Sequence, residues 1–164
     1  MIRVLFVCMG NICRSPMAQG VLERRLGEDR IADRVGVDSA GTHHFHGGEP
    51  PDPRAVAAAS RRGIAIGRQR ARRVRDDDFL EFDLILTMDS DNERALRKVC
   101  PPAYADRIMC ITEFAPDLRE REVPDPYYVG EEGFEKVLDM LELCLEGLMD
   151  ELHDRLDQRS TIAN

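Results

Sequence analysis

The chain has 164 residues, 43% of them hydrophobic, and a formal net charge of −8. This length fits a single domain, residues 1–164, with a substantial core. No apolar run approaches the roughly 20 residues that a membrane-spanning helix needs. The excess of acidic residues disfavours nucleic acid as a partner, because phosphate backbones require a basic surface. We therefore expect a protein that acts without binding membranes or nucleic acids.

Five cysteines lie at irregular intervals in the sequence. Their odd number, without an export signal at the N-terminus, is typical of a reducing cytoplasm rather than of a disulfide-linked secreted protein. The close pair has four residues between its members, which does not match a zinc site. We expect a cytoplasmic protein without zinc. The cysteines are Cys8, Cys13, Cys100, Cys110 and Cys144.

The first predicted element is a buried strand over residues 4–7, where apolar residues follow one another without alternation. Ser15 is a good N-cap, and Pro16 suits the first position of a helix. Gly27 can end that helix at its C′ position. A strand, a tight loop and a helix are therefore expected in this order.

A second strand is expected at residues 35–40. The loop that follows, residues 41–51, contains glycines, prolines and three histidines. Asp52 and Pro53 repeat the pattern of an N-cap followed by proline, so we expect a helix from residue 53 to about Gly63.

The second half of the chain continues the alternation. A strand is expected at 82–87, a helix that begins near 89–91 and ends before Pro101, and a strand at 107–110. After a loop rich in prolines and acids, the last helix is expected to begin near Gly130. Its buried face is predicted from apolar residues at helical spacing: Phe134, Val137, Leu138, Leu141, Leu145, Leu148 and Leu152.

Strands and helices alternate along the whole chain, with no repeat and no linker. This order predicts an α/β fold, a four-stranded parallel sheet flanked by helices on both faces. Ligands of such folds bind beyond the carboxyl ends of the strands. The stretch CMGNICRSP, residues 8–16, lies at one of these ends.

The loop over residues 8–14 has the composition of an anion site. Gly10 permits backbone torsions that other residues avoid. Successive N–H groups and the following helix N-terminus can bind an anion, and Arg14 can bind two of its oxygens. The same positive field favours the thiolate of Cys8, which would attack a bound phosphate. The alternative is a small buried cysteine at a strand end, and Arg14 together with Ser15 favours the nucleophile.

Phosphoryl transfer to Cys8 requires an acid that protonates the leaving oxygen. Asp125 is the candidate. A proline on each side stiffens its backbone, and Tyr127 and Tyr128 can shelter the carboxyl group and flank a flat substrate. Asp–Pro sequences are common in structural turns, so Asp125 is favoured only because the chemistry at Cys8 requires an acid.

A dense run of charge follows the second predicted helix. Five arginines fall within residues 68–75, and three aspartates follow directly at 76–78. One interpretation is a solvated turn whose charges partly neutralise each other. The other is a basic rim that attracts a phosphorylated substrate.

Four segments together resemble the low-molecular-weight protein tyrosine phosphatases. They are residues 4–16, 38–42, 83–89 and 124–128, in the family's order over almost the whole chain. The resemblance implies a flavodoxin-like sheet of the phosphotyrosine phosphatase I type and hydrolysis of phosphotyrosine and aryl phosphates. It implies no cofactor and no metal, because Arg14 and the backbone amides supply the positive field.

The resemblance also implies the catalytic roles. Cys8 would form a phosphocysteine, and Arg14 would bind the phosphoryl group and stabilise the transition state. Asp125 would protonate the departing phenolate and then activate water. Cys13 would pair with Cys8 under oxidation and so protect the thiol reversibly.

Other residues of the family pattern would support the loop. Ser15 would hydrogen-bond the sulfur and make it a better leaving group. Asn11 would hold the loop shape through Ser39. The remaining phosphate-binding positions are Met9, Gly10, Ile12 and Cys13.

Two positions depart from the family pattern. Gln69 stands where the family often has a histidine that braces the asparagine of the loop, and a modest change in loop rigidity is expected. Phe45 takes the place of a tryptophan or tyrosine in the substrate wall, which Tyr127 and Tyr128 complete. Three histidines surround Phe45, and a surface loop with an aromatic wall is favoured there over a metal site.

Two other functions remain open at this point. A thioredoxin-coupled arsenate reductase would share the fold and the loop, but it needs further cysteines near the nucleophile, and Cys100 and Cys110 are poorly placed for that. A phosphate-binding module without catalysis would need neither a nucleophile nor an acid.

The expected partner is a protein that carries phosphotyrosine. Tyr127 and Tyr128 are candidates for phosphorylation, so a tyrosine kinase is a candidate partner. The default oligomeric state is a monomer.

Overall fold

The computed structural model describes residues 1–162. Its sheet has four parallel strands in the order β2-β1-β3-β4. The predicted α/β fold is therefore confirmed. The strands are β1 (Ile2–Cys8), β2 (Val35–Gly41), β3 (Leu84–Thr87) and β4 (Ile108–Cys110).

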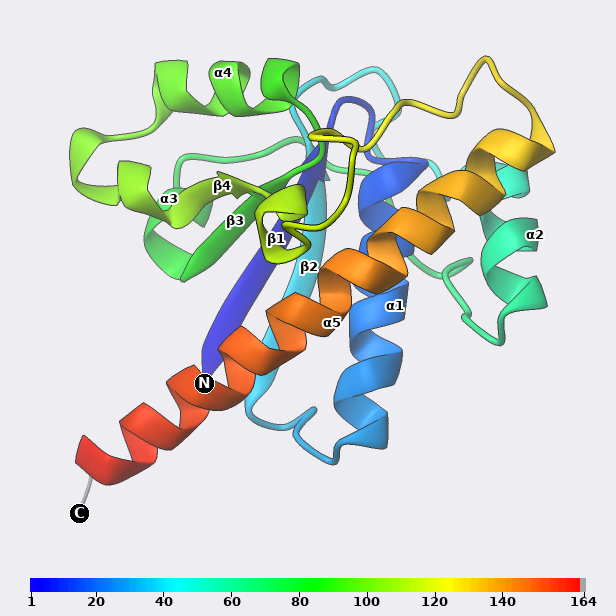
Figure 1. Ribbon diagram of the computed structural model, residues 1–164. Helices are drawn as coiled ribbons and strands as arrows, with labels where there is room; N and C mark the ends of the chain where they lie inside the picture. The colour runs from blue at the N-terminus through cyan, green and yellow to red at the C-terminus, as the bar shows by residue number, and fades with distance from the viewer. Residues whose placement is uncertain (163–164) are drawn as a thin grey trace.

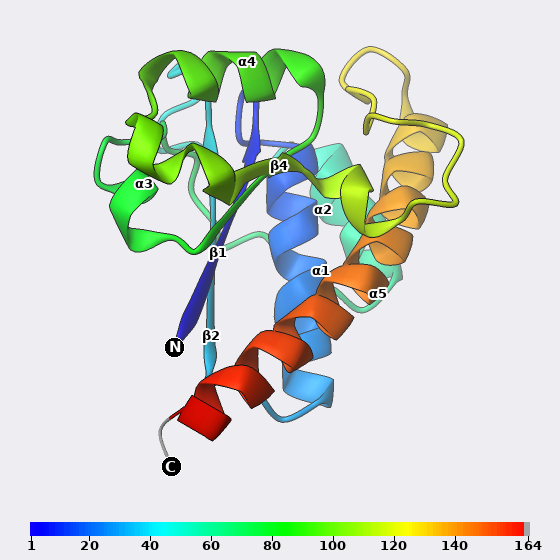
Figure 2. The same cartoon turned by 60° about the vertical axis from the view of Figure 1, so that its left-hand side comes forward.

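Helices cover both faces of this sheet (Figures 1 and 2). On one face α5 (Glu131–Ile162) runs across α1 (Arg14–Glu28) and α2 (Pro53–Arg61). The other face carries α3 (Asp78–Glu81) and α4 (Ser90–Val99). Two short 3-10 helices flank β4: η1 (Pro102–Arg107) and η2 (Ile111–Phe114).

Strand β1 lies at the centre of the sheet and contributes to both hydrophobic cores. Val4 and Phe6 belong to the cluster formed with α1 and α5. Leu5 and Val7 belong to the smaller cluster on the opposite face. Because successive side chains of a strand point to opposite faces, an unbroken apolar run is required where both faces are covered.

Several predicted helix ends are confirmed. The Asp52 carboxylate accepts a hydrogen bond from the Arg54 N–H at the start of α2, and Pro53 occupies the first helical position. Gly63 follows α2 with a φ of 74°, the left-handed conformation that favours glycine. Helix α4 begins after Asp89, whose side chain accepts from the Asn92 N–H in a capping box.

The predicted ends of α1 are wrong. The helix begins at Arg14, so its N-cap is Cys13 rather than Ser15. The Ser15 side chain faces the sulfur of Cys8 instead. Gly27 lies within the helix, and the left-handed residue that follows the helix is Arg30, with a φ of 58°. Sequence patterns for caps do not distinguish a hydroxyl that caps a helix from one that contacts a neighbouring strand.

The arginine and aspartate run is not simply a solvated turn. Arg72 forms ion pairs with Asp38 and Asp78, both at 2.9 Å, and Asp78 is fully buried. This pairing joins the segment to β2 and α3. Within residues 1–162, no helix is both long and apolar enough to cross a membrane.

Cys144 gives a pH-dependent test of this fold. Its side chain on α5 is fully buried. Burial raises the pKa of the thiol to about 12, and the nearby Cys110 adds to the shift. The folded protein therefore keeps this proton at pH values where the unfolded chain releases it. The stability that results is present below about pH 8.5 and is lost as the pH rises toward 12.

We expect Cys144→Ala to flatten this loss. Between pH 9 and 11, its free energy of unfolding should fall less steeply than that of the wild type, by about 1.4 kcal/mol per pH unit. Urea denaturation at a series of pH values measures both slopes. Equal slopes in the two proteins would contradict the burial of this thiol.

Candidate active site

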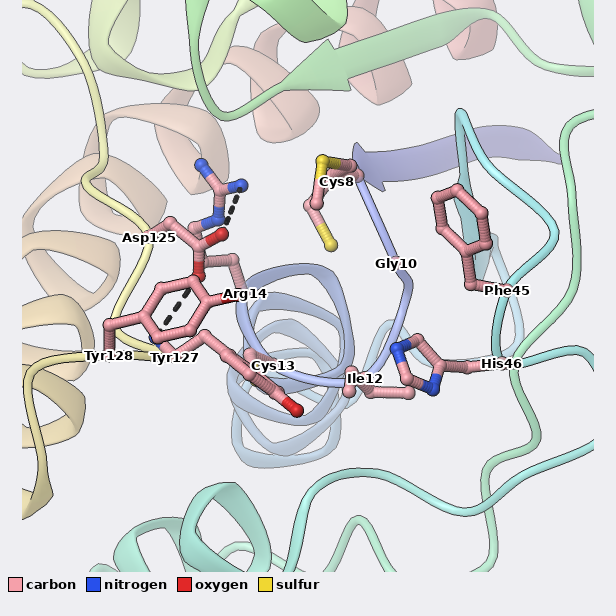
Figure 3. A pocket seen from close by; sticks show the side chains of 11 residues that line it. Cys8, Gly10, Ile12, Cys13, Arg14, Phe45, His46, Asp125, Tyr127 and Tyr128 are labelled. Carbon is pink, nitrogen blue, oxygen red and sulfur yellow. Dashed lines mark hydrogen bonds and ion pairs between the residues drawn. The ribbon is translucent and has the colours of Figure 1, made fainter.

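The candidate site lies where the order of strands in the sheet changes direction, with β2 on one side of β1 and β3 on the other. Strand β1 pairs with β2 on one side and with β3 on the other, so the loop after β1 leaves the sheet at this switch point. A pocket of about 290 Å³ opens there, and Figure 3 shows its residues. It is lined by Cys8, Met9, Gly10, Ile12, Cys13, Arg14, Phe45, His46, Asp125, Tyr127 and Tyr128.

The loop turns at Asn11, which has a φ of 57°. Asparagine is among the few residues besides glycine that adopt this left-handed conformation readily. The predicted role of Gly10 is therefore wrong, because the special backbone torsion belongs to its neighbour. A Cβ on Gly10 would lie 3.2 Å from Cδ2 of His46, so the small residue keeps room for that wall of the pocket.

The start of the loop is fixed to the end of β2. The N–H of Thr42 donates to the carbonyl of Cys8 at 2.9 Å, and the N–H of His43 donates to that of Met9 at 3.0 Å. A Cβ on Gly41 would come within 2.7 Å of the Met9 carbonyl oxygen. Glycine at this position therefore permits the close approach of the two segments.

The backbone N–H groups of residues 9–13 donate no hydrogen bond to any acceptor within residues 1–162. These groups surround the pocket at the N-terminus of α1, where the helix dipole is positive. A row of free N–H groups at such a terminus can bind an anion. The loop therefore has the free donors that an anion site requires.

Asn11 connects the loop to three other segments. Its Nδ2 donates to Oγ of Ser15 at 2.8 Å and to Oγ of Ser39 at 2.9 Å. Its Oδ1 accepts from the backbone N–H of Arg72 at 3.0 Å. The predicted contact between Asn11 and Ser39 is present.

Ser15 connects this network to the sulfur of Cys8. Its Oγ lies 3.0 Å from the Cys8 Sγ and 3.5 Å from the Ala40 carbonyl oxygen. Because this oxygen accepts from Asn11, its own hydrogen is free to point at the nearer sulfur. The Ser15 hydroxyl is therefore placed to donate a hydrogen bond to the Cys8 sulfur.

Gln69, at the position where the family often has a bracing histidine, forms no hydrogen bond with Asn11. Its Nε2 donates to the carbonyl of Pro16 at 3.0 Å, and its buried Oε1 has no partner within residues 1–162. The backbone N–H of Arg72 binds Asn11 instead. A backbone donor cannot be recognised from residue types alone.

Arg14 is 97% buried, with its side-chain exposure at 3%. Its Nη1 donates to Oδ2 of Asp89 at 2.6 Å and to the Val123 carbonyl at 3.0 Å. Burial lowers the pKa of the guanidinium, but the charges of Cys8 and Asp89 outweigh that effect and raise it. Nε and Nη2 have no hydrogen-bond partner within residues 1–162 and can bind an oxyanion.

Asp89 is one of two residues, with Arg54, whose contacts at the site the sequence did not reveal. Its Oδ1 caps α4 by accepting from Asn92, and its Oδ2 holds Arg14. The cap alone explained an aspartate at this position. The second contact depends on the carboxyl end of β3 lying beside β1, which only the fold reveals.

Asp125 lies beside Arg14 on the side of the pocket opposite Phe45, as Figure 3 shows. Its Oδ2 lies 3.8 Å from Nη2 of Arg14, and its Oδ1 accepts from the Tyr127 N–H at 3.1 Å. The side chain is 40% exposed, so it can exchange protons with water. The pairing places the predicted acid beside the anion site.

Arg54 holds the loop that carries Asp125, and the sequence analysis did not identify it. Its Nη1 donates to the Tyr127 carbonyl at 2.9 Å, and its guanidinium lies over the rings of Tyr127 and Phe134. Asp52 orients Arg54 through two side-chain hydrogen bonds, which lower the pKa of the carboxyl group. The N-terminus of α2 thereby anchors one side of the pocket.

The walls of the pocket are aromatic. Figure 3 shows Tyr127 on one side of Cys8 and Phe45 and His46 on the other. Phe45 is 74% exposed and Tyr128 is 90% exposed, so both form the rim rather than the interior. Among the predicted wall residues, Tyr127 is the more enclosed at 38% exposure.

Cys13 also lines the pocket but is chemically different from a nucleophile. Burial raises the pKa of its thiol, and the charges of Asp52 and Cys8 add to this shift. The side chain therefore remains protonated at neutral pH.

Two of the three histidines beside Phe45 have defined partners. His43 stacks on Phe45 with ring centroids 5.3 Å apart, and Nδ1 of His46 lies 2.8 Å from Oε2 of Glu49. In the described part of the chain, no group of three or more histidine, cysteine or acidic side chains is arranged to hold a metal ion.

Comparison with known proteins agrees with this geometry. The family model described as "Low molecular weight phosphotyrosine protein phosphatase" matches residues 3–158. The chain belongs to this family. The short anion loop, its arginine and the opposed aspartate thus lie in a fold that the family model covers almost from end to end.

Relatives within the family align over nearly their whole length. A putative low molecular weight protein-tyrosine-phosphatase of Synechocystis is 40% identical, over 94% of this chain and 98% of the relative. The human low molecular weight phosphotyrosine protein phosphatase is 35% identical, over 92% and 95%. A crystal structure of a protein tyrosine phosphatase from Entamoeba histolytica, with Hepes in the active site, superposes with a TM-score of 0.91 at 38% identity and covers 94% of this chain and 98% of that one.

The contact between Asp89 and Arg14 yields a direct prediction. Asp89→Asn keeps a good N-cap for α4 but removes the charge that orients the guanidinium. We expect kcat/KM for an aryl phosphate to fall about tenfold or more, with weaker inhibition by inorganic phosphate and a lower melting temperature, because the buried guanidinium loses its counter-charge.

Asp91→Asn is the matched control. Asp91 lies on the same helix and pairs with the exposed Arg94. This variant should keep wild-type kinetics. Equal kinetics in both variants would show that Asp89 does not position Arg14.

Proposed function

We propose that this protein hydrolyses phosphotyrosine in proteins through a phosphocysteine formed on Cys8. The observation that carries the proposal is the row of free N–H groups over residues 9–13, which is followed by Arg14 and lines the same pocket as Cys8. A phosphate bound there meets a nucleophile, a fixed positive charge and an acid.

In the first step the Cys8 thiolate attacks phosphorus and forms the S–P bond while the bond from phosphorus to the phenolic oxygen breaks. Nε and Nη2 of Arg14 and the loop N–H groups stabilise the negative charge on the equatorial oxygens. Asp125, protonated at this stage, gives its proton to the departing phenolate. The phenol leaves neutral, and Asp125 is left as carboxylate.

In the second step water attacks the phosphorus of the phosphocysteine. The Asp125 carboxylate removes a proton from this water as the new P–O bond forms. The S–P bond breaks, and the sulfur leaves as a thiolate that the Ser15 hydroxyl stabilises by hydrogen bonding. Inorganic phosphate is released, and both Cys8 and Asp125 return to their starting protonation states.

The shape of the pocket supports an aryl phosphate as substrate. Tyr127 and Phe45 stand on opposite sides of Cys8 (Figure 3), and aromatic walls favour a flat ring. The phosphotyrosine side chain has such a ring, and it is long enough for its phosphate to reach a recessed sulfur. The sulfur is recessed, because Cys8 is only 2% exposed.

The proposal extends to the setting of the enzyme. We take residues 1–164 as one catalytic domain that acts as a monomer in the cytoplasm. Tyr128 is 90% exposed, which supports its accessibility to a tyrosine kinase.

The contacts of the other cysteines disfavour arsenate reduction. Cys100 caps the end of α4 and Cys110 ends β4, where its sulfur accepts from the Thr112 hydroxyl. Among the residues that line the pocket, the cysteines are Cys8 and Cys13. Transfer of oxidation from Cys8 to Cys100 or Cys110 would require the segment that carries that cysteine to move toward the pocket.

Two substitutions test the mechanism. With p-nitrophenyl phosphate between about pH 5 and 7, Cys8→Ser should abolish turnover because it removes the nucleophile. Asp125→Asn should lower kcat by about 10²- to 10⁴-fold, the usual contribution of a general acid. Its effect should be largest for aryl phosphates with poor leaving groups. Stopped assays in the presence of a chelator should give the same rates, since the mechanism uses no metal.

The wild-type enzyme must be fully reduced in this assay. Absence of turnover by that enzyme would contradict the proposal. Reduction of arsenate with thioredoxin would then identify the reductase, and binding of phosphate without either reaction would identify a binding module.

A further inference from the structure

A second hollow lies beside the catalytic pocket and shares a wall with it. Its volume is about 810 Å³, and Phe45 lines both cavities. Across Phe45 from Cys8, this groove is bordered by the segment 73–76 and by α4. A polypeptide that places a phosphotyrosine in the pocket therefore has a continuous surface on which its neighbouring residues can lie.

Two arginines line the groove without an acidic partner. Arg73 and Arg75 are exposed, and neither side chain forms an ion pair within residues 1–162. The neighbouring Arg72 differs, because it already forms ion pairs with Asp38 and Asp78. One carboxylate, Asp76, also lines the groove. In a chain with a net charge of −8, two unpaired arginines on one wall favour an acidic ligand.

The backbone that carries these arginines is held firmly. The N–H of Val74 donates to the Gly41 carbonyl at 2.9 Å, and the N–H of Arg75 donates to Oδ2 of Asp78 at 2.8 Å. Arg73 forms an isolated parallel bridge with Gly41 at the end of β2. Because the segment is fixed beside the catalytic loop, its guanidinium groups are presented to a ligand with little ordering cost.

Thr42, His43 and His44 line the groove beside Phe45, and its floor and the α4 side are apolar. Phe79 and Leu96 are buried beneath it, and Val99 on α4 is 62% exposed. Such a surface accommodates the aliphatic stems of glutamate side chains while their carboxylates meet the arginines. A bare phosphate ion would use the charges alone, whereas an acidic peptide uses both features.

We propose that this groove binds an acidic stretch of the substrate polypeptide next to the phosphotyrosine, and that Arg73 and Arg75 determine this preference. The inference rests on the proposed phosphatase function and adds the class of sequence that the enzyme selects. It also assigns a role to part of the arginine-rich segment.

The test compares two phosphotyrosyl peptides of equal length. One has glutamates on both sides of the phosphotyrosine, and the other has glutamines at the same positions. The wild-type enzyme should favour the acidic peptide about fivefold in kcat/KM, mainly through KM, as two partly exposed ion pairs would give. The double variant Arg73→Gln/Arg75→Gln should lose most of this preference.

A matched variant separates the groove from general attraction. Arg68→Gln/Arg70→Gln removes the same charge from the same segment, but neither residue lines the groove. This control should keep the preference, and both variants should hydrolyse p-nitrophenyl phosphate at the wild-type rate because that substrate does not reach the groove.

Each contrary outcome has its own meaning. Equal turnover of the two peptides by an enzyme active on p-nitrophenyl phosphate would overturn the groove proposal alone. An equal loss of preference in both double variants would overturn it too, by showing long-range steering. Inactivity of the reduced wild type on p-nitrophenyl phosphate would instead remove the proposed function and this inference with it.

Discussion

The hydrogen bonds of the Asn11 side chain are the constraint on which the rest of the site depends. This one amide, 2% exposed, joins the catalytic loop to α1 through Ser15, to β2 through Ser39 and to the arginine-rich segment through Arg72. Its left-handed backbone turns the loop so that successive N–H groups remain free for an anion. A buried amide with all these partners is costly to replace, because each lost bond leaves a polar group unsatisfied.

The sheet brings the other functional groups to this loop. Cys8 and Gly41 end strands β1 and β2, and Asp89 follows shortly after β3. Parallel pairing of β1 with β2 and β3 places these ends together, although they are far apart in the sequence. Asp125 arrives from a separate loop that Arg54 fastens to α2. Stability of the fold and placement of the charges are thus maintained by the same contacts.

Much of this organisation could be predicted from the sequence. The buried strand at residues 4–7 and the Asp52–Pro53 helix start are local signals with strong physical causes, and the structure contains both. The choice of Asp125 followed from chemistry, since a phosphoryl transfer needs an acid, and its Oδ2 lies 3.8 Å from Nη2 of Arg14.

Other features depend on tertiary contacts that residue types do not reveal. Ser15 is a residue type that favours the N-cap position, yet its hydroxyl forms hydrogen bonds with Cys8 and Asn11 instead. Asp89 was expected only near the start of a helix, while its side chain both caps that helix and binds Arg14. The partner of Gln69 could not be predicted, because the Asn11 oxygen already accepts from the backbone N–H of Arg72. In each case a polar group has two plausible partners, and long-range packing selects between them.

The central claim is that the loop over residues 8–14 presents the Cys8 sulfur to a bound phosphoryl group. The most direct measurement is a rapid acid quench of the enzyme during turnover of an aryl phosphate, followed by mass spectrometric location of the phosphoryl group. We expect a phosphate on Cys8 and none on Cys13, because the thiol of Cys13 stays protonated. Turnover with no phosphorylated cysteine, or with the phosphoryl group on Cys13, would contradict it.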